Sequence, residues 1–237
     1  MSTILFNGRP DGLGNRIEQL IILEAYCIKN NCKINYYWEN KYTFRTYKNL
    51  FICKNIIIQD KIKHKIDNLK IKSENFSKED FHNATKNISL SYNLPKLDYE
   101  YIAVHIRAGD KLRNIGKDEF TLEFLKKNFI KCINIINNLS IKNINIVICS
   151  DDNFLKNKFI KNLNKNIIVK NPYETIDLND EYKDFYKLVN AKEIFMVPKF
   201  SSYAATASLL GNNILNSFVN ENETSLYRYK CNVNYIE

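Results

Sequence analysis

Long apolar runs are missing from this sequence of 237 residues. Its apolar stretches, such as residues 56–58 and 144–149, are strand-sized or interrupted by Asn, whereas a membrane-spanning helix needs about 18 apolar residues or more. Residues 1–8 also lack the charged start and the apolar region of a signal peptide. We therefore expect a cytoplasmic protein that contacts membranes only peripherally, at their anionic inner face.

Metal-binding motifs are missing as well. Cys27 and Cys32 are not spaced as in a zinc knuckle, and no His follows them at ligand distance. The three His residues of the chain share no motif. We expect no metal and no cofactor, and we interpret the six Cys residues as buried or incidental thiols.

Arginine is scarce, with 6 Arg against 29 Lys, while Asn (35) and Ile (32) are abundant. This bias is typical of an AT-rich genome and accounts for part of the net charge of +9. A basic balance still favours acidic partners: nucleotides, phosphosugars, nucleic acid or an anionic membrane face. An Arg that persists against such a bias indicates a place where its planar, two-pronged guanidinium is needed.

The first part of the chain predicts a parallel α/β layer. A strand is expected at residues 3–7, a Gly/Pro/Asp loop at 8–14, a helix from about Asn15 and a strand at 34–38. In that helix the apolar positions that share one face are Ile17, Leu20, Ile21, Ala25 and Ile28. Further on, we expect a strand at 56–58, a helix at 61–69 and a linker at 93–96. Residues 73–94 are polar and show no clear period, so that no element is assigned to them.

The second part shows strands and helices in regular alternation. The expected strands are 101–106, 144–149, 167–169, 194–197 and 214–218, the last of which closes the set. The helices between them are expected at 122–139, from residue 153 to about 163, at 180–191 and at 203–210. This order predicts a doubly wound parallel sheet whose ligands bind off the carboxyl ends of the strands.

The distinctive polar residues follow the expected strands, so that they gather at this ligand-binding edge. They are Asp11 to Arg16 after the first strand, then His105, Arg107, Asp110, Lys111 and Arg113, then Ser150, Asp151 and Asp152, and finally Ser201, Ser202 and Tyr203.

Each of these segments has a binding interpretation and a structural one. Gly12-Leu13-Gly14-Asn15 opens a helix and suits an anion, or it is an ordinary tight turn. Arg107 suits a phosphate, whereas His105 is a ligand contact or a core imidazole, and Asp110 orients Arg107 or braces the loop. The hydroxyls of 201–203 form a second anion-binding element or simply cap a helix.

Together these motifs resemble the bacterial α-1,2-fucosyltransferase family and its wider superfamily of α-1,2-, α-1,6- and protein O-fucosyltransferases. Residues 12–19 (GLGNRIEQ) are similar to the family's G-[LM]-G-N-Q, and residues 105–110 (HIRAGD) to its H-x-R-R-G-D. Residues 148–152 (ICSDD) are similar to F-S-D-D, and residues 184–192 with 200–205 (FSSYAA) to the D-x-x-L-M-x-x-[CA]-K…S-x-F-S-W-W-A-A block. The four segments occur in the family's order.

The resemblance implies an α/β enzyme of the GT-B type with two Rossmann-like halves, the N-terminal one reduced. Residues 1–95 would form the acceptor-side half and residues 96–237 the half that binds a GDP-sugar. Such enzymes transfer a sugar with inversion and without a metal, here fucose from GDP-fucose to a glycan or lipid-linked oligosaccharide in surface polysaccharide synthesis. No nucleic-acid partner is expected.

The resemblance also implies roles for single residues. Arg107 would stabilise the charge on the leaving GDP, and Asp11 or Glu18 would act as the base. The donor would contact the remaining candidates: Gly12, Gly14, Asn15, His105, Asp110, Lys111, Arg113, Ser150, Asp151, Ser201, Ser202 and Tyr203.

This sequence departs from the family pattern at three places, with Arg16 for Gln, Ala108 for the second Arg, and Tyr203-Ala204 for the aromatic pair. Three alternatives therefore stay open. The first is a transferase of another GDP-linked deoxyhexose or heptose. The second is a non-catalytic nucleotide- or RNA-binding module, which would require aromatic residues interleaved with Lys and Arg on strands. The third is a degenerate transferase that binds a donor without turning it over.

Overall fold

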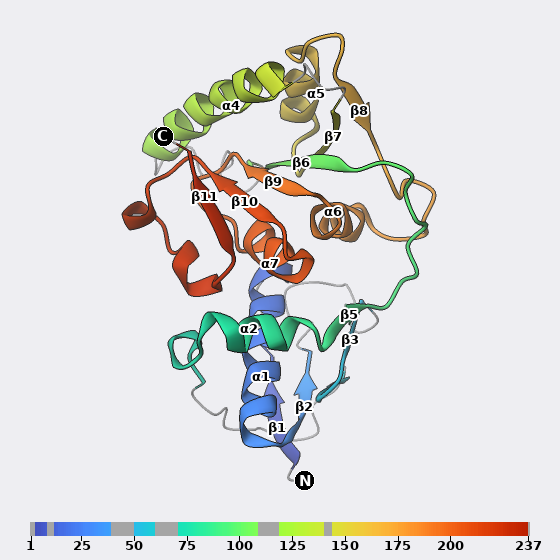
Figure 1. Ribbon diagram of the computed structural model, residues 1–237, viewed down its shortest axis with the longest axis vertical. Helices are drawn as coiled ribbons and strands as arrows, with labels where there is room; N and C mark the ends of the chain where they lie inside the picture. Colours follow the sequence, from blue (N-terminus) through green and yellow to red (C-terminus); the bar gives the residue numbers. More distant parts are fainter. Residues whose placement is uncertain are drawn as a thin grey trace. The chain divides into compact units, whose positions relative to one another are not determined.

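The computed structural model describes residues 3–8, 12–38, 50–59, 71–108, 119–139 and 144–236, without the side chains of 119–122 (Figure 1). The chain forms two compact units. Unit 1 comprises Met1–Leu94 and Arg228–Lys230, and unit 2 comprises Pro95–Tyr227 and Cys231–Glu237. The division after Leu94 differs by one residue from the expected boundary, and the return of Arg228–Lys230 to unit 1 had no counterpart in the sequence analysis.

Unit 1 begins with the strand–helix–strand arrangement expected from the sequence. Strand β1 (Thr3–Asn7) leads into helix α1 (Leu13–Asn30) and strand β2 (Lys33–Tyr37), and β4 (Ile56–Gln59) follows. The three strands are parallel in the order β1-β2-β4. Helix α1 ends at Asn31, whose left-handed conformation (φ 48°) turns the chain so that the Cys32 N–H also reaches the Cys27 carbonyl, at 3.2 Å.

Helix α1 is buried on most of its surface, not on one face alone. Ile17, Leu20 and Ile21 are fully buried as expected, but Ile28 is 43% exposed. Arg16 and Glu18, which the apolar pattern placed off the buried face, are at most 1% exposed. The periodicity therefore located the helix, but it did not identify which of its polar residues are buried.

The stretch from 73 to 94, which showed no clear period, contains helix α2 (Lys78–Thr85) and strand β5 (Ile88–Leu90). Strand β5 pairs antiparallel with β3 (Phe51–Cys53) in a separate two-stranded sheet. A capping box begins α2, in which Ser77 and Asp80 bond each other's backbone N–H groups. This Ser-x-x-Asp spacing was a sequence signal for the helix. The helix expected at 61–69 lies outside the described residues.

Unit 2 contains a six-stranded parallel sheet in the order β11-β10-β9-β6-β7-β8. All five expected strands are present within one residue of their expected ends, and β11, which lies parallel beside β10, is additional. The prediction that the strand at 214–218 closes the set is therefore wrong. The strands are β6 (Tyr101–Ile106), β7 (Asn145–Ser150), β8 (Ile168–Lys170), β9 (Glu193–Met196), β10 (Ile214–Ser217) and β11 (Asn232–Tyr235).

Helices cover both faces of this sheet (Figure 1). One face carries α4 (Glu119–Leu139) and α5 (Asn153–Lys161), and the other carries α6 (Asp180–Val189) and α7 (Ser202–Gly211). Strand β6 is buried at all six positions, as its continuous apolar sequence indicates for a central parallel strand. Side chains of β6, β7 and β9 form one apolar core with Phe129 and Phe159 from the covering helices.

Two further observations bear on the sequence predictions. All six Cys are free; four are buried, while Cys53 and Cys231 are half-buried. None of the described helices combines the length and the apolar character needed to cross a bilayer.

Candidate functional site

The candidate site in unit 2 begins where the central strand β6 ends. His105 is the penultimate residue of β6 and is only 5% exposed, whereas Arg107 follows the strand and is half-buried. Both residues lie at the carboxyl edge of the sheet, where parallel α/β folds bind ligands. Asp110, Lys111 and Arg113 lie outside the described residues.

His105 is held as a neutral imidazole. Burial, together with the nearby positive charge of Arg107, lowers its pKa to about 3. Its Nε2 lies 3.0 Å from the Ser201 hydroxyl oxygen, and its ring stacks on Tyr203 with centroids 5.6 Å apart. The ring therefore connects the end of β6 to the start of α7. This burial favours a positioning role for His105, and direct contact with a donor stays a prediction.

The start of α7 presents backbone donors at the same sheet edge. Ser201 is the N-cap, and its hydroxyl accepts a hydrogen bond from the Ala204 N–H at 3.3 Å. Tyr203 is anchored, since its hydroxyl donates to the Glu181 carbonyl and its ring meets Phe185 edge-on. The N–H groups of Ser202 and Tyr203 belong to the first helical turn, where intrahelical acceptors are lacking and the dipole favours an anion.

The segment after β7 is fastened to the end of β6. One carboxylate oxygen of Asp151 accepts the Ala108 N–H at 2.8 Å. The Ser150 hydroxyl bonds the backbone of Asp152, whose own carboxylate caps α5 at Leu155. Ser150 and Asp152 thus shape the turn, while Asp151 is exposed and its second oxygen makes no hydrogen bond with the described residues.

In unit 1, Gly12 and Gly14 lie at the start of α1. Gly12 has φ −63°, which any residue can adopt. A Cβ at Gly12 would meet nothing within 4 Å, and the backbone is therefore open to close approach. Gly14 is buried and Asn15 is half-buried in the first turn.

The two predicted bases are Asp11 and Glu18. Asp11 lies outside the described residues. Glu18 is 1% exposed, and its two carboxylate oxygens accept from Arg228 Nε at 2.9 Å and Nη2 at 3.0 Å. The Tyr229 hydroxyl lies 3.5 Å from the same carboxylate. Both oxygens of this buried carboxylate are engaged by the guanidinium and are not open to an acceptor hydroxyl, which favours a structural role for Glu18.

Sequence reasoning did not find the arginine that binds Glu18. Arg228 lies 210 residues away along the chain, and no local pattern links the two. The scarcity of arginine was the only available signal, because it marks each of the six as a place where the planar fork is needed. Arg16 is a second example: it is fully buried, and its guanidinium lies 4.8 Å from the centre of the Trp38 ring.

Among the described residues, no group of three or more His, Cys, Asp or Glu is placed to hold a metal ion. The unit 2 edge instead combines a guanidinium, a helix N-terminus and one open carboxylate oxygen. Such an arrangement suits a ligand with an anionic part and a hydrogen-bond-donating part.

No protein-family model and no curated protein matches the sequence. Solved structures do match. The fucosyltransferase NodZ from Bradyrhizobium aligns with 88% of this chain and 91% of its own, at 12% identity and a TM-score of 0.53. NodZ α-1,6-fucosyltransferase soaked with GDP-fucose aligns with 88% of this chain and 92% of its own, at 11% identity and a TM-score of 0.52. POFUT1 in complex with GDP aligns with 90% of this chain and 95% of its own, at 11% identity and a TM-score of 0.57.

At such low identity the likeness concerns the fold. It extends over nearly the whole of both chains, and it includes structures with GDP or GDP-fucose in their descriptions. The chain therefore has an α/β fold, with parallel sheets, that is similar to the fold of GDP-fucose-dependent fucosyltransferases.

Proposed function

We propose that this chain is an inverting, metal-independent fucosyltransferase that moves fucose from GDP-fucose to a glycan hydroxyl in surface polysaccharide synthesis. One combined observation carries the proposal. The fold resembles that of GDP-fucose-dependent enzymes over about nine-tenths of the chain, and the described residues of the family-like segments, 105–108 and 200–205, lie at the carboxyl edge of its six-stranded sheet.

In this proposal unit 2 binds the donor. The diphosphate meets Arg107 and the first N–H groups of α7, and His105 keeps Ser201 and Tyr203 in place without adding a charge of its own. The open oxygen of Asp151 accepts from the base or the ribose. Arg107 lowers the barrier by stabilising the charge that grows on GDP as the glycosidic bond breaks.

Nucleotide selectivity is the first test. A thermal-shift screen with GDP, UDP, CDP and ADP is expected to show stabilisation by GDP alone, because binding to the folded state raises its melting temperature. Stabilisation by UDP and not by GDP would contradict the donor assignment.

Arg107 is the residue whose replacement tests the mechanism. Arg107→Lys keeps the charge but loses the two-pronged grip on phosphate oxygens, so we expect turnover to fall by about tenfold or more with an unchanged melting temperature. Lys126→Ala, an exposed cation on α4, is the control. Near wild-type turnover in Arg107→Lys would show that another group carries the leaving-group charge.

Metal independence has a test of its own. We expect turnover to survive EDTA, since Arg107 and a helix N-terminus can carry the diphosphate charge. Complete loss in chelator with recovery on adding Mn²⁺ or Mg²⁺ would contradict this part of the proposal.

One observation keeps a second candidate open, namely a transferase of another GDP-linked deoxyhexose or heptose. The position of the family's second Arg is Ala108, which is fully buried and belongs to the apolar core of unit 2. An Arg could not occupy that core position in the same way, so the surroundings of the donor sugar differ from the family pattern. Side-by-side assays with GDP-fucose, GDP-mannose and a GDP-heptose separate the two candidates.

A further inference from the structure

Unit 2 contains a pocket that none of the motifs described above includes. It has a volume of about 640 Å³, within the range of small-molecule sites. It lies against α4 and beside Phe218 and Ile236, the residues that directly follow β10 and β11. The candidate donor residues follow β6, β7 and β9 instead.

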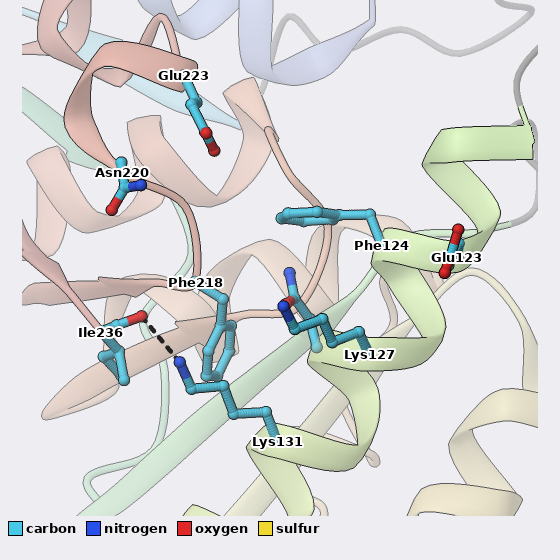
Figure 2. Close-up of a pocket in the computed structure, with 9 residues that line it drawn as sticks. Glu123, Phe124, Lys127, Lys131, Phe218, Asn220, Glu223 and Ile236 are labelled. Atoms are coloured by element: carbon cyan, nitrogen blue, oxygen red, sulfur yellow. Dashed lines mark hydrogen bonds between the residues drawn. The ribbon is translucent and has the colours of Figure 1, made fainter.

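The floor of this pocket is rigid. Lys131 on α4 donates a hydrogen bond of 3.1 Å to the Ile236 carbonyl, and its ammonium lies 5.8 Å from the centre of the Phe218 ring (Figure 2). The Ile236 N–H in turn bonds the Ser217 carbonyl at 2.8 Å, which joins the ends of β10 and β11. The buried Asn128 of α4 reaches the Val197 carbonyl at 3.3 Å. The pocket is therefore formed before any ligand arrives.

The rim carries polar groups that have no partner among the described residues. Lys127 of α4, and Asn220 and Glu223 of the segment after β10, are exposed, and their side chains make no hydrogen bond or ion pair with described residues. Phe124 extends from α4 toward the same opening (Figure 2). Donors, acceptors and aromatic rings thus surround one space.

The charges decide what kind of ligand fits. Lys127 and Lys131 are balanced by Glu123 and Glu223, so the formal charges that line the pocket cancel. A phosphate would be opposed by the two carboxylates, and an apolar ligand would cover these charges without giving them hydrogen bonds. A sugar hydroxyl both donates and accepts, which matches lysine, amide and carboxylate together. The C–H face of a sugar ring also suits the negative face of an aromatic ring.

We infer that this pocket binds an uncharged saccharide segment, with Phe124 as its aromatic platform and Lys127, Asn220 and Glu223 as its hydrogen-bonding partners. The pocket is a second sugar site, separate from the donor residues. That the bound segment belongs to the acceptor glycan rests on the proposed function, whereas saccharide binding itself does not.

The test is saturation-transfer NMR and calorimetric titration of the whole chain with maltotriose, chitotriose and a fucosylated trisaccharide, with inorganic phosphate as the anionic probe. Wild type is expected to bind at least one neutral trisaccharide. Phe124→Ala, Lys127→Ala and Asn220→Ala are each expected to weaken that binding by about tenfold, which equals about 1.4 kcal/mol. The matched controls on α4 are Lys126→Ala and Ile130→Ala, which are exposed, lie outside the pocket and should bind as wild type does.

Three results would overturn the inference: no binding of any neutral trisaccharide by wild type, binding unaffected by the three pocket variants, or phosphate binding that depends on Lys127. GDP binding is measured in the same proteins. If GDP fails to bind while the trisaccharides bind through the pocket residues, the proposed function falls and the saccharide site stands. If GDP binds and the trisaccharides do not, the saccharide site falls and the proposed function stands. Lys127→Ala and Asn220→Ala change exposed side chains, so a folding defect in Phe124→Ala does not decide the outcome.

Discussion

The two units bury different kinds of side chains. Unit 2 is organised around a core of aliphatic and aromatic residues on β6, β7, β9 and the helices above them. Among the described residues of unit 2, the buried charged side chain is Lys187, which pairs with Asp184 one turn away on the same helix at 2.9 Å. Unit 1 instead buries Arg16, Glu18 and Glu24, all on α1 and all at most 1% exposed.

The partners of these unit 1 charges come from distant parts of the chain. Glu18 is bound by Arg228, and Glu24 accepts hydrogen bonds from Asn55 at 2.7 Å and Asn87 at 3.0 Å. Apolar contacts are non-directional, whereas buried hydrogen-bonded charges stabilise only when their partners are in place. Unit 2 is therefore expected to tolerate polar surface changes, and unit 1 to depend on a few specific pairs.

Removing a core aromatic ring from unit 2 should have the largest effect. Phe159 of α5 is fully buried and meets Phe129 edge-on at 5.3 Å. Phe159→Ala is expected to lower the free energy of unfolding by about 3–5 kcal/mol, since it leaves a cavity. Urea unfolding followed by circular dichroism measures the loss. Trp38, the single Trp of the chain, lies in unit 1, so its fluorescence transition should move less.

The matched control is Phe154→Ala on the same helix, where the ring is 74% exposed. It should cost less than about 0.5 kcal/mol. Equal shifts of the fluorescence and dichroism transitions in Phe159→Ala would mean that the two units unfold together. The difference in stability between unit 1 and unit 2 could then not be measured separately.

Breaking the distant ion pair should have the next largest effect, and in unit 1. Arg228→Ala leaves the buried Glu18 carboxylate without its guanidinium, at a cost of about 3 kcal/mol. Arg228→Lys keeps the charge without the fork and should lose less. Trp38 fluorescence in urea measures both variants. Glu100→Gln, which breaks an exposed pair with Lys192 in unit 2, is the control; followed by circular dichroism, it should cost less than about 1 kcal/mol. A loss in Arg228→Ala no greater than in this control would contradict the role of the pair.

A smaller loss is expected for Glu24→Gln. The Glu24 carboxylate accepts from the Asn55 and Asn87 side chains and from the Asn55 N–H, whereas one end of a Gln amide can only donate. Burial raises the pKa of Glu24, which shows how little water reaches it. We expect a loss of about 1–2 kcal/mol by Trp38 fluorescence. Glu74→Gln, exposed in the same unit, should leave the transition in place.

The smallest expected effect is the contribution of His105 in unit 2 to the pH dependence of the free energy of unfolding. His105 has a folded pKa of about 3, below its usual value of about 6.5. As the pH falls below about 6.5, the unfolded chain takes up a proton that the folded one does not. This group should therefore lower the free energy of unfolding by at most about 1.4 kcal/mol per pH unit.

Urea unfolding at several pH values, compared between wild type and His105→Asn, isolates the contribution of His105 from that of the carboxylates. His82→Asn, at an exposed position of α2, is the control and should keep the wild-type slope. A wild-type slope in His105→Asn would show that this imidazole is not held neutral in the fold.

The sequence by itself determined the α/β class and most of the elements, for a local reason. A fully covered parallel strand such as β6 is apolar at every position, and an amphipathic helix such as α4 repeats its apolar residues every three or four positions. The polar residues after β6, β7 and β9 could be assigned to one sheet edge, because the carboxyl ends of parallel strands lie together. The roles of these residues toward a donor stay predictions.

The tertiary structure decided what depends on partners far apart in the chain. It paired β3 with β5, added β11 beside β10, brought Arg228 to Glu18 and made Ala108 a core residue. The pairing of two strands is not encoded in the local pattern of either one, and a charged residue is buried or exposed according to whether a distant partner satisfies it. The saccharide pocket also belongs to this class, since α4 and the ends of β10 and β11 meet only in the folded chain.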